Sequence, residues 1–176
     1  MLELLAPAGN LDAVIAAVQN GADAVYMGFG DGFNARRSAD NFTRESFAKA
    51  VRYCHIRGCK VYVTLNTLVG DREMEAAAAL AQQASDAGAD AILVQDLGLA
   101  RVLRDALPDI PLHASTQMSI HNLAGVEAAA EMGITRAVLS RELSLEQIRF
   151  ISQHASIETE VFVHGALCFC YSGQCY

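Results

Sequence analysis

The chain has 176 residues, of which 52% are hydrophobic and 19% charged, and its formal net charge is −7. This length suits one globular domain with a sizeable core, and the composition excludes a disordered chain. The negative charge argues against a protein that coats nucleic acid by charge alone. We expect no membrane span, because polar residues or glycine interrupt every apolar stretch, and no signal peptide. We therefore predict a cytoplasmic protein.

Short runs rich in Val, Ile, Leu and Tyr alternate with longer Ala-rich segments of helical period. In chain order, the pattern predicts strands at Glu3–Ala6, Ala24–Met27, Lys60–Leu65, Ala91–Val94, Pro111–Ala114, Ala137–Leu139 and Ile157–Val163. It predicts helices near 10–20, 43–56, 71–87, 97–106, 122–131 and 144–153. Capping residues mark three of the helix starts: Asn10, Asp71 and Ser144, the last with Gln147 as its partner.

Glycine recurs at three predicted helix ends, just before a strand, at Gly21, Gly88 and Gly133. We expect each to adopt the left-handed conformation that turns the chain back toward the sheet.

Apolar strands separated by helices imply a parallel sheet with right-handed crossovers. An open doubly wound sheet and a closed barrel both satisfy this pattern, and the short, regularly spaced strands favour a TIM-type (β/α) barrel. A full barrel has about 250 residues. We therefore expect residues 1–176 to form a single (β/α)-barrel domain that is truncated at its C-terminal end. Its unpaired first and seventh strands would favour dimerisation through the open edges.

Polar side chains follow nearly every predicted strand, which is where a barrel builds its site. Each one alone could simply mark a loop, but together they indicate a functional ring. Arg141 and Glu142 could pair with each other, or Arg141 could grip a substrate carboxylate. Asp96 is at least as readily a helix N-cap. The glycines of residues 28–32 are not predicted to bind a nucleotide, since the P-loop lysine is missing.

Three of the five cysteines, Cys168, Cys170 and Cys175, fall within eight residues and close to His164. Clustered thiols outside a secreted chain are typical of metal or redox chemistry. The ligands of an iron–sulfur cluster, a zinc site that includes His164, and a catalytic pair of His164 with Cys168 all remain open. So does simple packing of the thiols under the barrel rim.

Two other groups of residues are expected to be structural or solvated. Cys54 and Cys59 should lie at the opposite end of the barrel from the clustered thiols, as inert buried thiols. Basic residues gather between positions 36 and 60, where most of them should decorate a solvated helix face: Arg36, Arg37, Arg44, Lys49, Arg52, Arg57 and Lys60.

Four segments carry a resemblance to a known family. They are Leu4–Asn10, Phe33–Arg36, Ser140–Glu142 and the terminal signature Glu-x-Phe-x-x-Gly-Ala-Leu-Cys-x₄-Gly-x-Cys at Glu160–Cys175. They resemble the peptidase U32 family, also called collagenase-like peptidases. The resemblance runs from the first residues to the last and covers the N-terminal part of a family protein.

This resemblance implies more than the family name. It leads us to expect an oxygen-independent hydroxylation protein. One group of such proteins modifies a cytidine of large-subunit ribosomal RNA, another a wobble uridine of transfer RNA, and a third a ubiquinone precursor. Prephenate, a small carboxylate, is the associated hydroxyl donor, and the third group holds a 4Fe-4S cluster with four cysteines. Cys168 and Cys175 resemble two of those four, whereas Cys170 is outside the signature. Phe33–Arg36 and Cys168–Cys170 are most similar to the ribosomal-RNA group.

We therefore predict an RNA-hydroxylating enzyme with Cys168 and Cys175 as cluster ligands and Cys170 as a third candidate. Arg36 and Arg141 are candidates for binding the donor's carboxylates. Candidates for orienting or proton-transfer groups are Asn66, Gln117, Glu142 and His164. One alternative is a collagenase-like peptidase, although the chain has no Gly-x-Ser-x-Gly or His-Glu-x-x-His motif. The other is a partner subunit of the ubiquinone pathway.

Overall fold

The computed structural model describes residues 2–30, 32–35, 41–165 and 168–174. These residues form seven strands and six α-helices that alternate along the chain, with one short 3₁₀ helix. The chain splits into two compact units, Met1–Leu93 and Val94–Tyr176. The single barrel domain over 1–176 remains a prediction.

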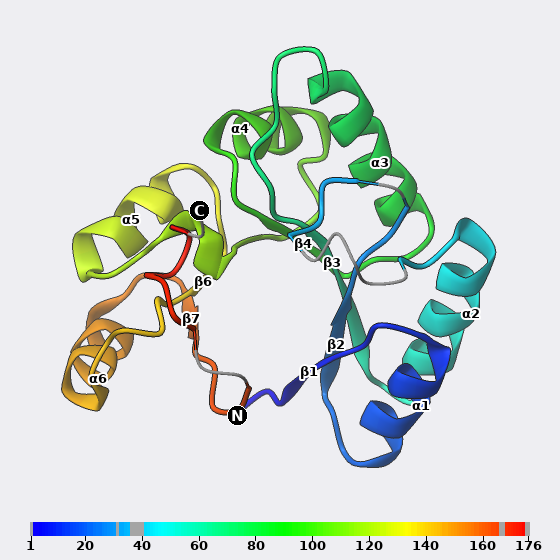
Figure 1. Ribbon diagram of the computed structural model, residues 1–176, viewed down its shortest axis with the longest axis horizontal. Helices are drawn as coiled ribbons and strands as arrows, with labels where there is room; N and C mark the ends of the chain where they lie inside the picture. The colour runs from blue at the N-terminus through cyan, green and yellow to red at the C-terminus, as the bar shows by residue number, and fades with distance from the viewer. Residues whose placement is uncertain (1, 31, 36–40, 166–167, 175–176) are drawn as a thin grey trace. The chain divides into compact units, whose positions relative to one another are not determined.

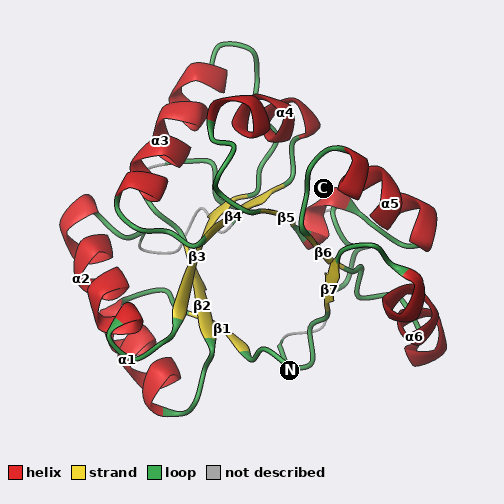
Figure 2. Cartoon of the chain, turned by 180° about the vertical axis from the view of Figure 1, so that it is seen from behind, coloured by secondary structure: helices red, strands yellow, loops and turns green. Residues whose placement is uncertain are grey.

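The first unit contains strands β1 (Leu5–Pro7), β2 (Ala24–Met27), β3 (Lys60–Leu65) and most of β4 (Ala91–Val94). They lie side by side in chain order, and β2 pairs in parallel with both β1 and β3 (Figure 1). Helices α1 (Leu11–Gln19), α2 (Arg44–His55) and α3 (Met74–Asp86) lie on the same side of these strands (Figure 2).

The second unit contains three parallel strands, which also follow chain order. They are β5 (Leu112–Ala114), β6 (Arg136–Val138) and β7 (Glu158–Glu160). The α-helices of this unit are α4 (Leu97–Ala106), α5 (Leu123–Glu131) and α6 (Leu145–His154), and a 3₁₀ helix, η1 (Thr116–Met118), follows β5.

Strands β2 to β6 are mostly buried, as expected for a parallel sheet covered by helices, whereas β1 and β7 are only partly buried. Every residue of β4 is buried, and so is every residue of β3 after Lys60. The helices bury one stripe each; α4, for example, buries Leu99, Ala100 and Leu103. Two predicted caps are confirmed, because Asn10 accepts a hydrogen bond from the N–H of Ala13 and Ser144 forms a capping box.

The glycine prediction is confirmed as well. Gly21, Gly88 and Gly133 have φ values of 90°, 97° and 81°, in the left-handed region that favours glycine. Each one ends a helix and lets the chain turn into the next strand. The order of strands and helices is that of the predicted (β/α) class, incomplete in this chain.

Four details of the prediction are wrong. Strand β1 spans Leu5–Pro7 rather than Glu3–Ala6, because its pairing with β2 begins at Leu5. Helix α3 begins at Met74 rather than near Asp71, because residues 71–73 form a turn that the Glu73 N–H closes on the Gly70 carbonyl. Strand β7 ends at Glu160 rather than Val163, and the apolar side chains that follow it are exposed. The 3₁₀ helix η1 was not expected, since three residues are too few to show a period. No helix in the described part of the chain is long and apolar enough to cross a membrane.

Candidate functional site

Ser172 lies in the loop that follows Cys168 and Cys170, and it is fully buried. Its N–H donates to Glu142 Oε1 at 2.6 Å, and its carbonyl accepts from Ser119 Oγ at 2.6 Å. Its hydroxyl oxygen accepts from the Arg141 backbone N–H at 3.1 Å and from Arg141 Nε at 3.3 Å. We call Ser172 with Ser119, Arg141 and Glu142 the Ser172 network. It satisfies the buried polar groups of Ser172 and fastens the loop to the chain that follows β6.

Arg141 connects this network to a thiol. Its Nη2 donates to Cys168 Sγ at 3.2 Å, and its guanidinium carbon lies 6.0 Å from the centroid of the Phe162 ring. A guanidinium in this position supplies hydrogen bonds to a sulfur that carries negative charge. Because a guanidinium presents five donors in one plane, Arg141 can also bind a carboxylate with the donors that these contacts leave over.

Glu142 holds the other side of the network as an ionised group. Burial raises the pKa of its carboxyl, but hydrogen bonds from its own backbone N–H and from Ser172, together with the nearby His121, outweigh this effect. The pKa of Glu142 is therefore below its ordinary value. The predicted alternative, in which Arg141 and Glu142 pair with each other, is not what the described contacts show, since both residues bind Ser172.

His121 extends the network beyond Glu142. Its Nε2 lies 3.3 Å from Glu142 Oε2, and its Nδ1 lies 2.7 Å from the carbonyl oxygen of Ser119. Ser140 Oγ lies 3.3 Å from the same Nδ1. A carbonyl only accepts, so Nδ1 is the donor in that contact, and Nε2 faces the Glu142 carboxylate. His121 is thus placed to hold or pass a proton at Nε2.

The loop around Ser172 fits closely against η1. Gly173 has a φ of 80°, and a Cβ at this position would collide with Ser119 Oγ and the Gln117 carbonyl oxygen. Ser119 itself has a φ of 58°, which is uncommon for a residue with a side chain. Gln117 Oε1 is buried and has no hydrogen-bond partner among the described residues. A buried acceptor of this kind can receive a hydrogen bond from a ligand.

In the first unit, a predicted site residue orders the segment that follows β2. Asn66 Oδ1, just after β3, accepts from the Ala35 N–H at 3.1 Å. Asn34 Nδ2 donates to Asn41 Oδ1 at 3.1 Å. A Cβ on Gly28 would collide with the ends of both asparagine side chains, so another residue there would displace them. The described part of the Phe33–Arg36 motif is thereby tied to the ends of β2 and β3.

The structure places the other predicted residues as follows. Arg36 and Cys175 lie outside the described residues. The His164 side chain is exposed. The described hydrogen bond of Cys168 comes from Arg141 and not from His164. Asp96 is the N-cap of α4, with Oδ1 accepting from the Leu99 N–H at 2.8 Å, so the cap reading of Asp96 is confirmed.

The exposure and the hydrogen-bond donor of Cys168 are those expected for a sulfur that binds an iron–sulfur cluster. The thiol is neither deeply buried nor fully exposed, and a metal-bound sulfur is well served by an N–H donor such as that of Arg141. Cys170 is exposed. Within the described ranges, no group of three His, Cys, Asp or Glu side chains could hold a metal ion. Further ligands would have to come from outside the described residues.

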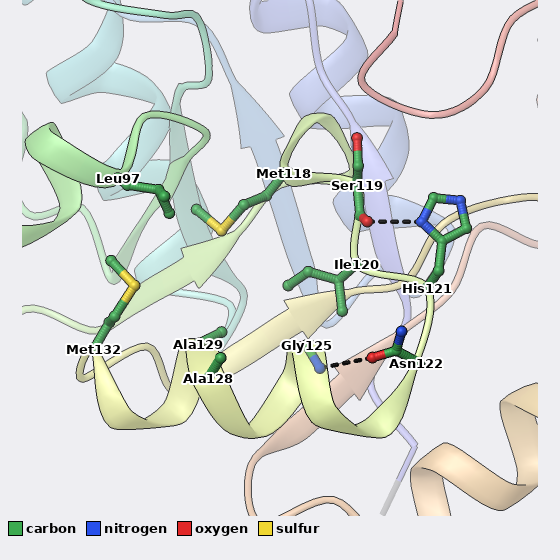
Figure 3. Close-up of a pocket in the computed structure, with 10 residues that line it drawn as sticks. All are labelled: Leu97, Met118, Ser119, Ile120, His121, Asn122, Gly125, Ala128, Ala129 and Met132. Carbon is green, nitrogen blue, oxygen red and sulfur yellow. Dashed lines mark hydrogen bonds between the residues drawn. The ribbon is translucent and has the colours of Figure 1, made fainter.

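An apolar cavity of about 350 Å³ adjoins the Ser172 network between the start of α4, η1 and α5. Leu97, Met118 and Met132 point into it, while the His121 ring extends toward the Ser119 carbonyl (Figure 3). The cavity therefore shares the 119–121 segment with the network but differs from it in chemistry.

Three residues of this site escaped the sequence analysis. Ser172 occupies a variable position of the terminal signature, and its contact with Glu142 joins residues 30 positions apart. Ser119 contacts Ser172 across 53 positions. His121 stands next to a helix cap, where a polar residue is typical of a loop. The only available signal was their closeness in sequence to Gln117 and to the cysteines.

Cys54 and Cys59 are buried in the first unit, as predicted. Burial, together with repulsion from Cys59, raises the pKa of Cys54 to about 12. Burial also raises the pKa of Cys59. Both are therefore thiols rather than thiolates at neutral pH, which makes them poor nucleophiles and poor metal ligands.

Comparison with known proteins gives the family that the motifs resemble. The sequence profile of "Peptidase family U32" matches residues 9–176. The 23S rRNA 5-hydroxycytidine C2501 synthase of Escherichia coli (strain K12) is 45% identical over 175 residues, 99% of this chain and 26% of that protein. The tRNA hydroxylation protein P1 of Bacillus subtilis (strain 168) is 40% identical, over 98% of this chain and 41% of that protein.

A relative with a different name also matches. The collagenase of Porphyromonas gingivalis (strain ATCC BAA-308 / W83) is 33% identical over 99% of this chain and 44% of that protein. The chain thus spans about a quarter to less than half of the length of these three relatives.

Solved structures confirm the predicted TIM-type barrel fold class. A U32 peptidase structure has a TM-score of 0.75 at 17% identity, over 92% of this chain and 68% of that one. The phosphoenolpyruvate phosphomutase from Streptomyces platensis subsp. rosaceus has a TM-score of 0.64 at 15% identity, with the same two coverages. At these identities the likeness shows the fold alone.

The raised pKa of Cys54 and Cys59 predicts which thiols react. At pH 8 only about 10⁻⁴ of Cys54 would be ionised, so iodoacetamide should label Cys168 and Cys170 well before Cys54 and Cys59. Peptide mass spectrometry after timed labelling measures this order, and labelling in urea serves as the control in which all four should react. Equal labelling of Cys54 and Cys168 in the native protein would contradict the assignment.

The lowered pKa of Glu142 predicts a pH-dependent contribution. Because the folded pKa is depressed, the stabilisation by the carboxylate is present above its ordinary pKa and is lost as the pH falls below about 4. At pH 7, Glu142→Gln should lower the hydrogen-exchange protection of the Ser172 amide by about tenfold, since a charged acceptor is the stronger one.

The difference between the two proteins should narrow as the pH is lowered from 7 through the folded pKa of Glu142, which lies below its ordinary value. Glu146→Gln, a change in an exposed acidic residue of α6, is the matched control and should leave Ser172 protected. Unchanged protection of Ser172 in the Glu142→Gln protein at pH 7 would remove Glu142 from the network.

Proposed function

The chain belongs to peptidase family U32, and from this membership we propose that it takes part in the oxygen-independent hydroxylation of an RNA base. The proposed enzyme uses a 4Fe-4S cluster and takes the hydroxyl group from prephenate. The protein would act in the cytoplasm, where ribosomal and transfer RNA are available. The chain spans less than half of the length of these relatives. The proposed activity is therefore that of the whole protein in the cell.

The names of the relatives support an RNA substrate. One relative is named a 23S rRNA 5-hydroxycytidine C2501 synthase, and several others are named tRNA hydroxylation proteins, at 33 to 40% identity. The 45% identity to the first favours ribosomal RNA over transfer RNA as the substrate class of this chain.

The observation that carries the proposal is the hydrogen bond from Arg141 to Cys168, held in place by Ser172. A thiol that faces a fixed cationic donor suits a sulfur that binds iron. When bound, a cluster supplies one-electron chemistry. Cys168 and Cys175 are the proposed ligands, and further cysteines of the cellular protein would complete the set.

The other polar residues receive roles that match their contacts. In the second unit, the remaining donors of Arg141 can bind a carboxylate of prephenate, and the buried Gln117 Oε1 can accept a hydrogen bond from a ligand. The Glu142–His121 pair can hold or pass a proton at Nε2. Arg36, Asn66 and His164 remain candidates, and Asn66 already orders the segment that leads to Arg36.

A peptidase is the second candidate, since one relative at 33% identity is named a collagenase. Its best nucleophile would be Cys168 with His164 as the base. Arg141 gives Cys168 a hydrogen-bond donor, whereas a cysteine nucleophile needs a base that takes its proton. This contact therefore favours hydroxylation over peptide cleavage. Cleavage of gelatin by the wild type that Cys168→Ala abolishes would favour the peptidase.

The proposed function predicts the loss of one hydroxylated nucleoside in a strain that lacks the gene. Mass spectrometry of nucleosides from ribosomal and transfer RNA measures it. The Cys168→Ala protein should fail to restore the modification, whereas the matched control Cys170→Ala should restore it. An unchanged nucleoside profile in the deletion strain would rule out RNA hydroxylation.

A further inference from the structure

Positive charge is concentrated in one short segment of this acidic chain. Residues 44–60 contain five of the 13 Lys and Arg residues and only one of the 20 Asp and Glu residues, which is a formal charge of +4. The rest of the chain therefore carries −11. This segment comprises α2 and the turn into β3, in the first unit.

The arginines of this segment are exposed and available for a partner. Two of the lysines have acidic neighbours, since Lys49 Nζ lies 2.7 Å from Glu45 and Lys60 Nζ lies 2.9 Å from Glu3. Arg44, Arg52 and Arg57 are exposed, and the described residues offer them no ion pair. We call these three arginines the α2 basic face.

One of these arginines is already ordered. The Arg57 guanidinium carbon lies 3.7 Å from the centroid of the Tyr53 ring, and its Nη1 donates to the Tyr53 carbonyl at 3.1 Å. Tyr53 is in turn contacted by Gln19 Nε2 at 3.4 Å from its hydroxyl. A guanidinium that is held in this way loses less conformational entropy when it binds an anion.

We propose that the α2 basic face binds the phosphate backbone of the RNA substrate. This inference rests on the proposed function for the identity of the polyanion. It is supported by charge complementarity, because residues 44–60 carry a formal charge of +4 in a chain whose net charge is −7, and three exposed arginines lie within this segment. The inference concerns positioning on the RNA and not the choice of base, since phosphate contacts carry no direct sequence information.

The dimensions of the face suit a phosphate backbone. A helix of 12 residues is about 18 Å long, and each strand of a B-form duplex carries one phosphate per about 3.4 Å of helix axis. Three arginines over this length can each reach a different phosphate. Arg44 stands at the first residue of α2 and Arg57 just beyond its last, so the contacts would extend along the helix.

The test compares RNA binding by two sets of substitutions. Arg44→Gln, Arg52→Gln and Arg57→Gln are combined in one protein. Arg72→Gln, Arg101→Gln and Arg149→Gln, at exposed arginines outside the face, are combined in the control. Fluorescence anisotropy with a mixed-sequence RNA oligonucleotide and with unfractionated transfer RNA gives Kd between about 50 and 200 mM KCl. Circular dichroism checks that both variants are folded.

The α2 variant should bind at least about tenfold more weakly than the wild type. Its slope of log Kd against log salt should fall by about two to three, one ion equivalent for each lost phosphate contact. The control should stay near the wild type. Equal weakening in both variants, or an unchanged α2 variant, would overturn the assignment of the face, as would a wild type that binds neither RNA.

The RNA-binding test and the test of the proposed function can fail independently of each other. If the α2 variant loses binding while the deletion strain keeps every hydroxylated nucleoside, the face stands as an RNA contact and the hydroxylation proposal fails. If the deletion removes a nucleoside and the α2 variant binds normally, the hydroxylation proposal stands and the RNA contact must lie elsewhere.

Discussion

Ser172 is a polar residue with no exposed surface in a loop, and this is tolerated only because its N–H, carbonyl and hydroxyl all have partners. Each such group would cost about 1–3 kcal/mol if it were buried without one. The partners come from two different segments, the turn after β5 and the chain after β6. The position of the thiol-bearing loop therefore depends on residues that are far from it in sequence.

This dependence gives the second unit its chemical character. Arg141 donates to Ser172 Oγ through its backbone N–H and Nε, and to Cys168 Sγ through Nη2. One residue therefore holds the loop in place and hydrogen-bonds the sulfur. Glu142 adds a fixed negative charge, and His121 Nε2 lies 3.3 Å from its Oε2. The donor that Arg141 offers to Cys168 suits a metal-bound sulfur better than a cysteine nucleophile, which needs a base.

Much of the fold was predictable, because buried parallel strands appear in the sequence as apolar runs and glycines mark the helix ends. Strands β2, β3 and β4 and helix α4 have the predicted bounds. The errors in the predicted element bounds fall where tertiary contacts determine the local structure. Val161, Phe162 and Val163 form an apolar run typical of a strand but are exposed after β7, and Asp71 lies in a turn instead of capping α3. In the site, the motifs identified Arg141, Glu142 and Cys168. Ser172 and His121 were missed, because their roles come from contacts that no local pattern records.

The central claim is that the Ser172 network positions Cys168 to bind an iron–sulfur cluster. The most direct measurement is the iron and sulfide content, with the visible spectrum, of the protein purified without oxygen from its own cell. Wild type, Cys168→Ala, Cys170→Ala and Ser172→Ala proteins would be compared. We predict a cluster in the wild type and in Cys170→Ala, none or a degraded one in Cys168→Ala, and reduced occupancy in Ser172→Ala. An iron-free wild type, or a Ser172→Ala protein with the same iron content and spectrum as the wild type, would contradict the claim.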